Sequence, residues 1–383
     1  MEHNWAGEER GDHAMLRTLR RALHQIPEVS GKEEKTSRLL AEFLSQCDHH
    51  GMVTDLGGHG IAVIFEGAAS GETLLFRAEL DAVPLQENSG KPWASRHDGV
   101  SHACGHDGHM AILCGVAAWL SETPLSRGRV VILFQPAEES GEGARKVLED
   151  SRFEGLLPDY VFALHNIPEE KMGRFRMPES LFACASLGLD IRLAGRPSHA
   201  ARPQEGISPA PVLLSTLHET GILHSDREDP YFMGTLTHMQ LGEAGFGVAP
   251  GEGRMQFTLR AHGENYLDYR VEEVKSFVSE AACRQGISCD FQMVDVFPAT
   301  RVDSTVSRLA FSALEQAGFE VALMKEPMAW SEDFGLFTGR FPGLMVGLGG
   351  GLCCGLHTCN YDFPDELIEY GVSFFQTMVR CFL

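Results

Sequence analysis

Hydrophobic residues along the chain form two kinds of pattern, short runs and longer periodic stretches. The short runs are mostly apolar at consecutive positions, as expected of strands buried on both faces of a parallel or mixed sheet. They are Ile61–Phe65, Thr73–Arg77, Val130–Phe134, Tyr160–Leu164 and Leu344–Leu348. Helical patterns cover Met15–Cys47, Met110–Leu120, Thr305–Ala317 and the C-terminal residues. The alternation predicts an α/β domain in which helices cover both faces of a mixed sheet.

The pattern changes between residues 185 and 296. The expected order there is strand, helix, strand, strand, helix, strand, which is the ferredoxin-like βαββαβ arrangement. Its elements are Leu187–Leu193, Ser208–Leu223, Thr235–Leu241, Arg254–Arg260, Tyr266–Gln285 and Ile287–Val296. We therefore predict a discontinuous larger domain, residues 1–184 and 297–383, with a smaller α+β domain inserted at residues 185–296.

Composition narrows the class of protein. Of 383 residues, 43% are hydrophobic and 22% charged, which indicates a globular chain with a sizeable core. The net charge of −21 disfavours nucleic acid and anionic membranes as partners. No apolar run approaches the length of a membrane span, and the N-terminus MEHNWAGEERGDH is too polar for a secretory signal. The ten cysteines have no disulfide-framework spacing, so we expect a cytoplasmic protein with reduced thiols.

The stretch HACGHDGH, residues 102–109, concentrates histidine and cysteine at the start of a predicted helix. The thiolate of Cys104 and the imidazole of His106 would be good ligands for zinc and other late first-row metals. The alternative is a polar turn in which Asp107 caps the following helix. If the stretch is a metal site, we expect His102 and His109 to support it rather than bind a metal.

Further residues of ligand type follow the predicted strands. They are Asp81, the adjacent Glu138 and Glu139, His165, and His357 after a Gly-rich loop. Each alone would more often be structural or solvated. Ligands do bind at the carboxyl ends of strands in α/β sheets, and together these residues exceed the needs of one tetrahedral zinc. The convergence therefore indicates a two-metal site of the kind found in hydrolases.

A rival local site would use His357 with Cys353, Cys354 and Cys359. That spacing lacks the paired ligands of a zinc ribbon or knuckle, so we favour His357 as a ligand of the larger site and the cysteines as packing residues.

The order of motifs resembles the amidohydrolase branch of the aminoacylase/carboxypeptidase metallopeptidases, from about His24 to the last helix. The motifs are LHQIPEVSGKEEKT, RAELDAVPLQE, GVSHACGHDGHMA, QPAEESGEGARKVLED, ALHNIP, GRPSHAARP, SEDFG and LHTCNYDFPDE. The resemblance implies hydrolysis of the amide bond in a small N-acyl amino acid or short peptide. It also implies two divalent metal ions, for which zinc, manganese, cobalt and nickel are all suitable, and an inserted domain that acts as a lid and forms a homodimer.

Matched by position, the residues take the following roles in that resemblance. Cys104, His106, Glu139, His165 and His357 correspond to the metal ligands. Glu138 corresponds to the general base, Asp81 to the residue that orients the site, and His199 to a histidine of the inserted domain that stabilises the oxyanion.

Some positions depart from the family pattern. The segment GRPSHAARPQEG replaces a sequence closer to GKGGHAAMPH, and Gly247 stands where many relatives have Asn. Both lie where substrate would be held, so the acyl group and amino acid stay open. Arg260 could pair with a substrate carboxylate, or it could be a solvated sheet residue.

Three alternatives to an N-acyl-amino-acid hydrolase remain. One is a dipeptidase or carboxypeptidase of the same family, and another is a metal-binding scaffold without activity. The presence of Glu138 with the whole ligand set argues against the scaffold. The third, a serine or cysteine hydrolase, is disfavoured because the chain has no G-x-S-x-G elbow and a nucleophilic Cys104 would compete with its role as a ligand.

Overall fold

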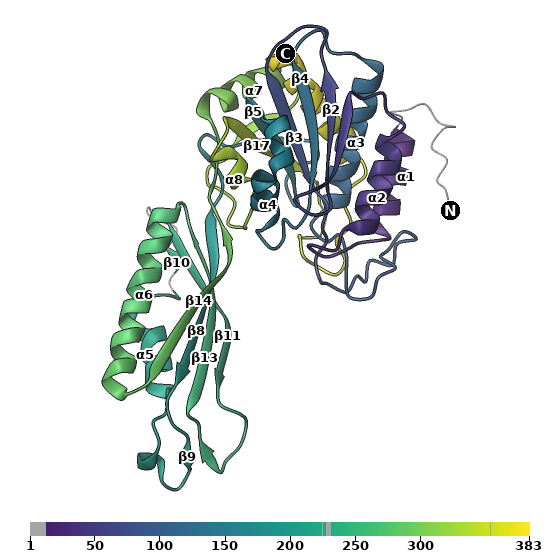
Figure 1. Ribbon diagram of the computed structural model, residues 1–383. Coiled ribbons are helices and arrows are strands. Elements are labelled where there is room, and N and C mark those ends of the chain that lie inside the picture. Colours follow the sequence, from purple (N-terminus) through teal and green to yellow (C-terminus); the bar gives the residue numbers. More distant parts are fainter. Residues whose placement is uncertain (1–12, 224, 227–230, 353) are drawn as a thin grey trace. The chain divides into compact units, whose positions relative to one another are not determined.

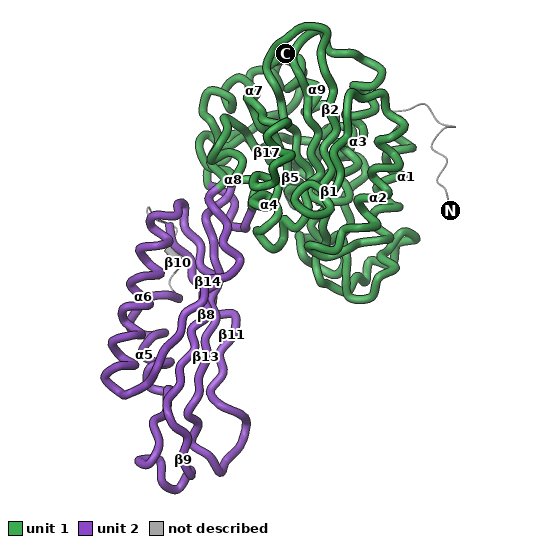
Figure 2. The backbone as a smooth tube through the Cα atoms, in the orientation of Figure 1, with its two compact units in different colours: residues 1–182, 300–326, 333–383 green, residues 183–299, 327–332 purple. Residues whose placement is uncertain are grey.

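The computed structural model describes residues 13–223, 225–226, 231–352 and 354–383. The chain forms two compact units (Figure 2): unit 1 comprises residues 1–182, 300–326 and 333–383, and unit 2 comprises residues 183–299 and 327–332. Residues 327–332, which the sequence boundaries leave in the larger domain, therefore cluster with unit 2.

Among the described residues, eight strands of unit 1 form a mixed sheet in the order β1-β2-β4-β3-β5-β17-β6-β16. Their bounds are β1 Gly51–Leu56, β2 Gly60–Glu66, β3 Thr73–Glu79, β4 Arg129–Gln135, β5 Tyr160–Ile167, β6 Phe175–Met177, β16 Val321–Leu323 and β17 Gly343–Gly349. The neighbours β4, β3, β5 and β17 run parallel to one another. Every residue of Val130–Phe134 in β4 is fully buried. Side chains on both faces of a central strand are covered, and this is why such a strand has an uninterrupted apolar sequence.

Helices cover both sides of this sheet (Figure 1). They are α1 His13–His24, α2 Glu34–Leu44, α3 His106–Glu122, α4 Gly143–Glu149, α7 Ser304–Gln316, α8 Gly335–Thr338 and α9 Leu367–Phe382. Helix α3 packs against α1 and α9, while α4 contacts α8 and β4. The apolar residues of α3 are buried around its whole circumference, which is the pattern of a helix in the interior of a large domain.

The start of α3 depends on two glycines. Gly105 precedes the helix at φ +94°, and a Cβ there would come within 2.7 Å of the Asn166 side chain. A Cβ on Gly108 would meet the ring of Phe363 at 2.4 Å. Only glycine allows this backbone conformation and this close approach together, so the two glycines set where Cys104 and His106 lie.

Unit 2 carries a separate antiparallel sheet in the order β10-β11-β13-β8-β14. Its strands are β8 Ala185–Ala194, β10 Ser225–Asp226, β11 Phe232–Leu241, β13 Glu252–Ala261 and β14 Ser288–Phe297, and its helices are α5 Ala210–Glu219 and α6 Glu264–Gln285. The predicted βαββαβ elements are all present, and their strands lie in the split order expected for that motif. The predicted fold class, an α/β layer domain with an inserted antiparallel α+β domain, is confirmed.

Several short elements were not predicted. They include the strands β1, β6, β10 and β16, the helices α4 and α8, the strand pairs β9 Ser198–His199 with β12 Val248–Ala249 and β7 Leu181–Ala183 with β15 Thr300–Arg301, and the 3-10 turns Ser151–Leu156 and Pro203–Glu205. The single helical pattern expected over Met15–Cys47 is wrong in its middle, because α1 ends at His24 and α2 begins at Glu34. Pro27 and Gly31, with φ +77° at the glycine, break the helix there. No helix within the described ranges is long and apolar enough to cross a membrane.

Candidate metal centre

The residues expected at strand ends do meet at one edge of the unit 1 sheet. Asp81 follows β3, Glu138 and Glu139 follow β4, and His165 lies near the end of β5. The parallel register aligns these ends, since Glu79 of β3 lies beside Gln135 of β4 and His165 lies beside Gly347 of β17. The carboxyl ends of parallel strands are where α/β sheets present their side chains to ligands.

Side chains at this edge come within reach of shared ions. The Sγ of Cys104 lies 3.5 Å from Nε2 of His165, and Nε2 of His357 lies 3.3 Å from Oε1 of Glu139. Potential ligand atoms lie within 4.8 Å of one another in each of three overlapping groups. The groups are Cys104, His106 and His165; Cys104, Glu139 and His357; and His106, Glu138 and Glu139. The overlap through Cys104 and His106 is the arrangement that two neighbouring cations would need.

The two buried imidazoles have a defined tautomer. Nδ1 of His106 lies 2.8 Å from the main-chain oxygen of Asp81, and Nδ1 of His165 lies 2.9 Å from the main-chain oxygen of Asn166. A carbonyl oxygen only accepts, so each Nδ1 carries a proton, and in the neutral form of each ring Nε2 presents a lone pair. The buried Nε2 of His106 has no hydrogen-bond partner. A metal ion would satisfy it.

The electrostatics of the cluster favour an added cation. Burial, together with the carboxylates of Glu139 and Glu138, raises the pKa of the Cys104 thiol well above its ordinary value. Burial lowers the pKa of His165 to about 3, so this imidazole is neutral and able to act as a ligand. A buried thiol among carboxylates loses its proton only when a positive charge is supplied nearby. The residues present therefore fit a pair of divalent metal ions.

His357 reaches the cluster from the loop after β17. Its main-chain N–H donates to the main-chain oxygen of Ala103 at 2.8 Å, which ties it beside Cys104. Its φ of +55° is uncommon for a residue with a Cβ and is the kind of backbone strain seen at functional sites. Among the described residues no candidate metal group includes Cys354 or Cys359, and Cys353 lies outside the described residues.

Within HACGHDGH, His109 is engaged by other side chains. Its Nδ1 lies 2.7 Å from Oε2 of Glu79, and its Nε2 lies 2.7 Å from Oδ1 of Asn166. Both ring nitrogens are thus occupied by hydrogen bonds. Glu79, His106 and His109 also form a candidate metal group, so the supporting role of His109 stays a prediction. The ring nitrogens of buried His102 have no hydrogen-bond partner.

The expectation that Asp107 caps the helix is wrong. The N-terminal cap of α3 is Gly105, with no side-chain cap hydrogen bond. The buried carboxylate of Asp107 instead accepts from His24 at 2.8 Å and from Arg20 at 3.2 Å. Those partners are more than eighty residues earlier in the chain, and local sequence contains no signal for such a contact.

Two residues expected to act on substrate lie in unit 2. His199 is exposed on β9, and its Nδ1 accepts the main-chain N–H of Ala201 at 3.0 Å, so the ring proton is on Nε2. Arg260 lies on β13, where its guanidinium donates to Oγ of Ser331 at 3.0 Å. It is a half-buried residue whose pKa is lowered by burial, not a fully solvated one.

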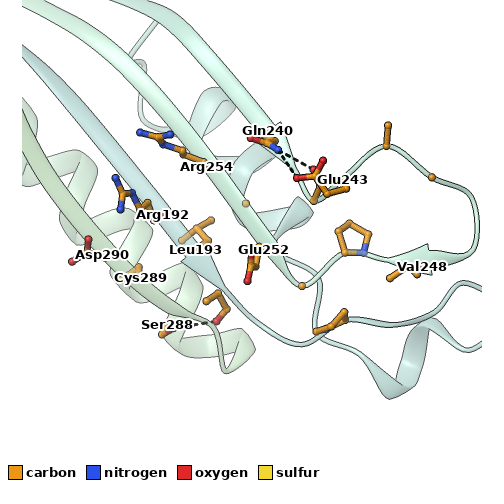
Figure 3. A pocket seen from close by; sticks show the side chains of 18 of the residues that line it. Arg192, Leu193, Gln240, Glu243, Val248, Glu252, Arg254, Ser288, Cys289 and Asp290 are labelled. Atoms are coloured by element: carbon orange, nitrogen blue, oxygen red, sulfur yellow. Dashed lines mark hydrogen bonds between the residues drawn. The ribbon is translucent and has the colours of Figure 1, made fainter.

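Unit 2 also contains a cavity of about 830 Å³ between the ends of β8, β13 and β14 and the loop that follows β11. Figure 3 shows Arg192, Arg254, Glu243 and Asp290 around it. Both arginines are already paired with Asp190. None of the proposed ligands lines this cavity, and neither do Glu138, Asp81, His199 or Arg260, but Pro197 and Gly247, from the two segments expected to hold substrate, do.

Sequence reasoning missed several buried polar residues around the cluster. Glu79, the last residue of β3, joins His109 to Arg77, and Arg77 continues to Asp333 at 2.7 Å. An acidic residue at the end of a buried strand, two positions before Asp81, was a signal that could have pointed to Glu79.

A family model described as Peptidase family M20/M25/M40 matches residues 75–380. The chain belongs to this family. Membership makes it a hydrolase of carbon–nitrogen bonds, and the resemblance inferred from the motifs is confirmed.

Individual relatives within the M20 family match most of the chain. The N-acetylcysteine deacetylase of Bacillus subtilis (strain 168) is 28% identical over 95% of each chain. An N-acetyldiaminopimelate deacetylase of Bacillus velezensis is 30% identical over 94% of this chain and 96% of the relative. The solved structure of the Bacillus subtilis YXEP protein, described as a dinuclear metal-binding peptidase of the M20 family, matches with a TM-score of 0.81 at 26% identity, covering 96% of this chain and 97% of that one.

Proposed function

We propose that the protein hydrolyses the amide bond of small N-acyl amino acids. The observation that carries the proposal is the buried cluster at the ends of β3, β4 and β5, in which the carboxylates of Glu138 and Glu139 lie beside His106 at 3.9 Å and 4.0 Å. The deacetylases among its relatives act on N-acetylcysteine and N-acetyldiaminopimelate, as their names state, and this supports the same substrate class here.

The metal ligands in this proposal are Cys104, His106, Glu139, His165 and His357. When bound, a pair of divalent cations polarises the amide carbonyl and lowers the pKa of water at the site. Cysteine, histidine and glutamate ligands suit zinc, manganese, cobalt or nickel. The Nδ1 hydrogen bonds of His106 and His165 hold their rings with Nε2 toward the cluster.

The protein's own side chains move the protons. Glu138 accepts the proton of the attacking water and then donates it to the leaving amine. The main-chain oxygen of Asp81 orients His106. The side-chain carboxylate of Asp81 accepts the N–H of Glu139 at 2.9 Å. His199, with its proton on Nε2, donates a hydrogen bond to the developing oxyanion. In this account unit 2 is the lid and the surface through which two copies form a homodimer.

Arg260 is proposed as the group that binds the carboxylate of the amino acid. Its contact with Ser331 holds the guanidinium in one orientation. Because a partly buried charge is costly without a counter-ion, pairing with a substrate carboxylate would lower that cost. Replacing Arg260 with Met should raise KM for N-acetyl amino acids much more than KM for the corresponding amino-acid amides.

A carboxypeptidase or dipeptidase is the second candidate. Thermostable carboxypeptidase 1 of Saccharolobus solfataricus is 31% identical over 86% of this chain and 84% of that protein. Hydrolysis of a panel of N-acetyl and N-benzoyl amino acids beside free dipeptides tests the two candidates. Faster turnover of the acylated amino acids supports the proposal, and turnover of dipeptides alone contradicts it.

We also place the protein in the cytoplasm. The nine cysteines within the described residues are all free thiols, including the proposed ligand Cys104, and a reducing compartment preserves them.

A further inference from the structure

The segment 28–33 is the later part of the connection between α1 and α2 and contains none of the proposed ligands or proton-transfer residues. It nevertheless sends two side chains, Ser30 and Glu33, toward the turn that carries Glu138 and Glu139. Glu33 has no exposed surface at all, which is rare for a glutamate and calls for hydrogen-bond partners.

Glu33 holds the backbone directly before the proposed base. Its Oε1 accepts the N–H of Ala137 at 2.8 Å and the N–H of Gly31 at 2.8 Å. Ala137 has φ +52°, a conformation that residues with a Cβ rarely adopt. The carboxylate therefore stabilises an unusual turn whose next residue is Glu138.

Ser30 acts on the other side of Glu138. Its hydroxyl donates to Oδ2 of Asp81 at 2.7 Å, and the same Oδ2 accepts the N–H of Glu139 at 2.9 Å. The N–H groups of residues 137 and 139 are thus each bound by a buried carboxylate, one supplied by the segment 28–33 and one oriented by it.

The segment is itself anchored. Oε2 of Glu28 accepts the N–H groups of Lys35 and Thr36, at 2.7 Å and 2.9 Å, at the start of α2. The main-chain oxygen of Glu28 accepts the N–H of Ala82 at 2.9 Å. Ser30 and Glu33 therefore project from a fixed backbone.

We propose that Ser30 and Glu33 are positioning residues that set the directions of the Glu138 and Glu139 carboxylates through the main chain between them. The inference rests on the proposed roles of those two glutamates. A small error in the direction of a proton-transfer group or ligand is costly, because both functions require defined geometry. No charge on Glu33 is needed for this role, only an oxygen atom that accepts two N–H groups.

The test compares Glu33→Ala with Glu33→Gln. The alanine variant should lower kcat for N-acetyl amino acids about 10–100-fold, the range seen when residues that support ligands are lost, with little change in KM. It should also release Zn²⁺ faster to a chromogenic chelator. The glutamine variant keeps an oxygen in place and should recover most of both properties. Glu34→Ala removes an exposed neighbour and should behave as the wild type.

Glu28→Ala separates positioning from stability. It removes the contacts to the start of α2 but keeps the main-chain bond to Ala82 and the side chain of Glu33, so it should lower Tm while slowing turnover less than Glu33→Ala does. The proposal is overturned if Glu33→Ala lowers Tm but leaves kcat and Zn²⁺ release unchanged. It is also overturned if Glu28→Ala slows turnover as much as Glu33→Ala does.

Two further outcomes keep the test decisive. If Glu33→Ala does not fold, Ser30→Ala, which removes one hydrogen bond, should show the same fall in kcat in smaller measure, and unchanged kcat would overturn the proposal. If the wild type hydrolyses no acylated amino acid, the proposed function fails but Zn²⁺ release still decides. Faster release from Glu33→Ala than from Glu34→Ala supports positioning, and equal rates contradict it.

Discussion

Two buried polar regions meet at the start of α3 and differ in how their charge is balanced. One is the metal centre around His106. The other, which we term the Arg20 network, comprises Arg20, His24, Glu87, Asp107, Asp362 and Asp365. His106 and Asp107 are adjacent in sequence and both are buried, yet each belongs to a different region.

In the Arg20 network the chain supplies its own cations. Arg20 lies 3.2 Å from Asp107 and 2.6 Å from Asp362, and His24 lies 2.8 Å from Asp107 and 3.3 Å from Glu87. At the metal centre the carboxylates of Glu138 and Glu139 lie beside imidazoles whose Nε2 atoms present lone pairs. Buried charge must be compensated. Arg21 and Lys91 add ion pairs to Asp365 and Asp362, so the chain's own cations balance the four carboxylates of the Arg20 network, whereas the second region is suited to added cations.

The largest effect is expected from Glu138→Gln. Loss of a proton-transfer group typically costs about 10²–10⁴ in rate, so kcat on N-acetyl amino acids should fall by that range. Metal content and Tm should stay close to wild type, because the amide replaces the carboxylate with nearly the same shape. Steady-state kinetics and metal analysis on the same preparation check this. Full activity in Glu138→Gln would remove Glu138 from the mechanism.

Arg20→Met tests the other region. Breaking a buried ion pair by removing one partner leaves uncompensated charge and costs about 3–5 kcal/mol. Urea unfolding should show that loss, while the folded protein should retain its metal. Lys146→Ala, which removes an exposed pair with Glu142, is the control and should cost under about 1 kcal/mol. Equal effects of the two substitutions would mean that the Arg20 network is not a stabilising one.

The division of HACGHDGH between ligand and support is tested by His106→Ala and His109→Ala. The first should abolish binding of at least one ion. The second removes only the hydrogen bonds to Glu79 and Asn166 and should weaken metal affinity about 10–100-fold. Isothermal titration with Zn²⁺ measures both. Equal metal loss from the two variants would show that His109 is itself a ligand.

The smallest effect is a pH dependence of stability carried by His24. Burial opposes its charge, but Asp107 and Glu87 outweigh burial and raise the pKa of His24 from 6.5 to about 9. Because the pKa is higher in the folded state, protonated His24 contributes its full stabilisation below pH 6.5. That stabilisation is lost as the pH rises through about 9. The Tm difference between wild type and His24→Gln should therefore shrink between pH 6.5 and 9.5. A constant difference over that range would contradict the account.

The parts of the molecule that could be predicted share a physical property. Strands such as Val130–Phe134 are contiguous in sequence and fully buried, so their pattern was sufficient to locate them. Glu139, His165 and His357 could be grouped because they lie at or after the ends of parallel strands of one sheet, whereas Cys104 and His106 were found from their spacing at the start of α3. The roles of Asp107 and Glu33 could not be predicted, because their partners are remote in sequence and become neighbours only after α1 and α2 pack on the sheet.

Metal dependence tests the central contrast most directly. Full removal of metal by a chelator, followed by titration with Zn²⁺ or Mn²⁺ and assay on an N-acetyl amino acid, should show no activity in the stripped protein. Activity should return in parallel with binding of two ions per chain, and Tm should show that the stripped protein stays folded. Undiminished hydrolysis by the metal-free protein would contradict the account.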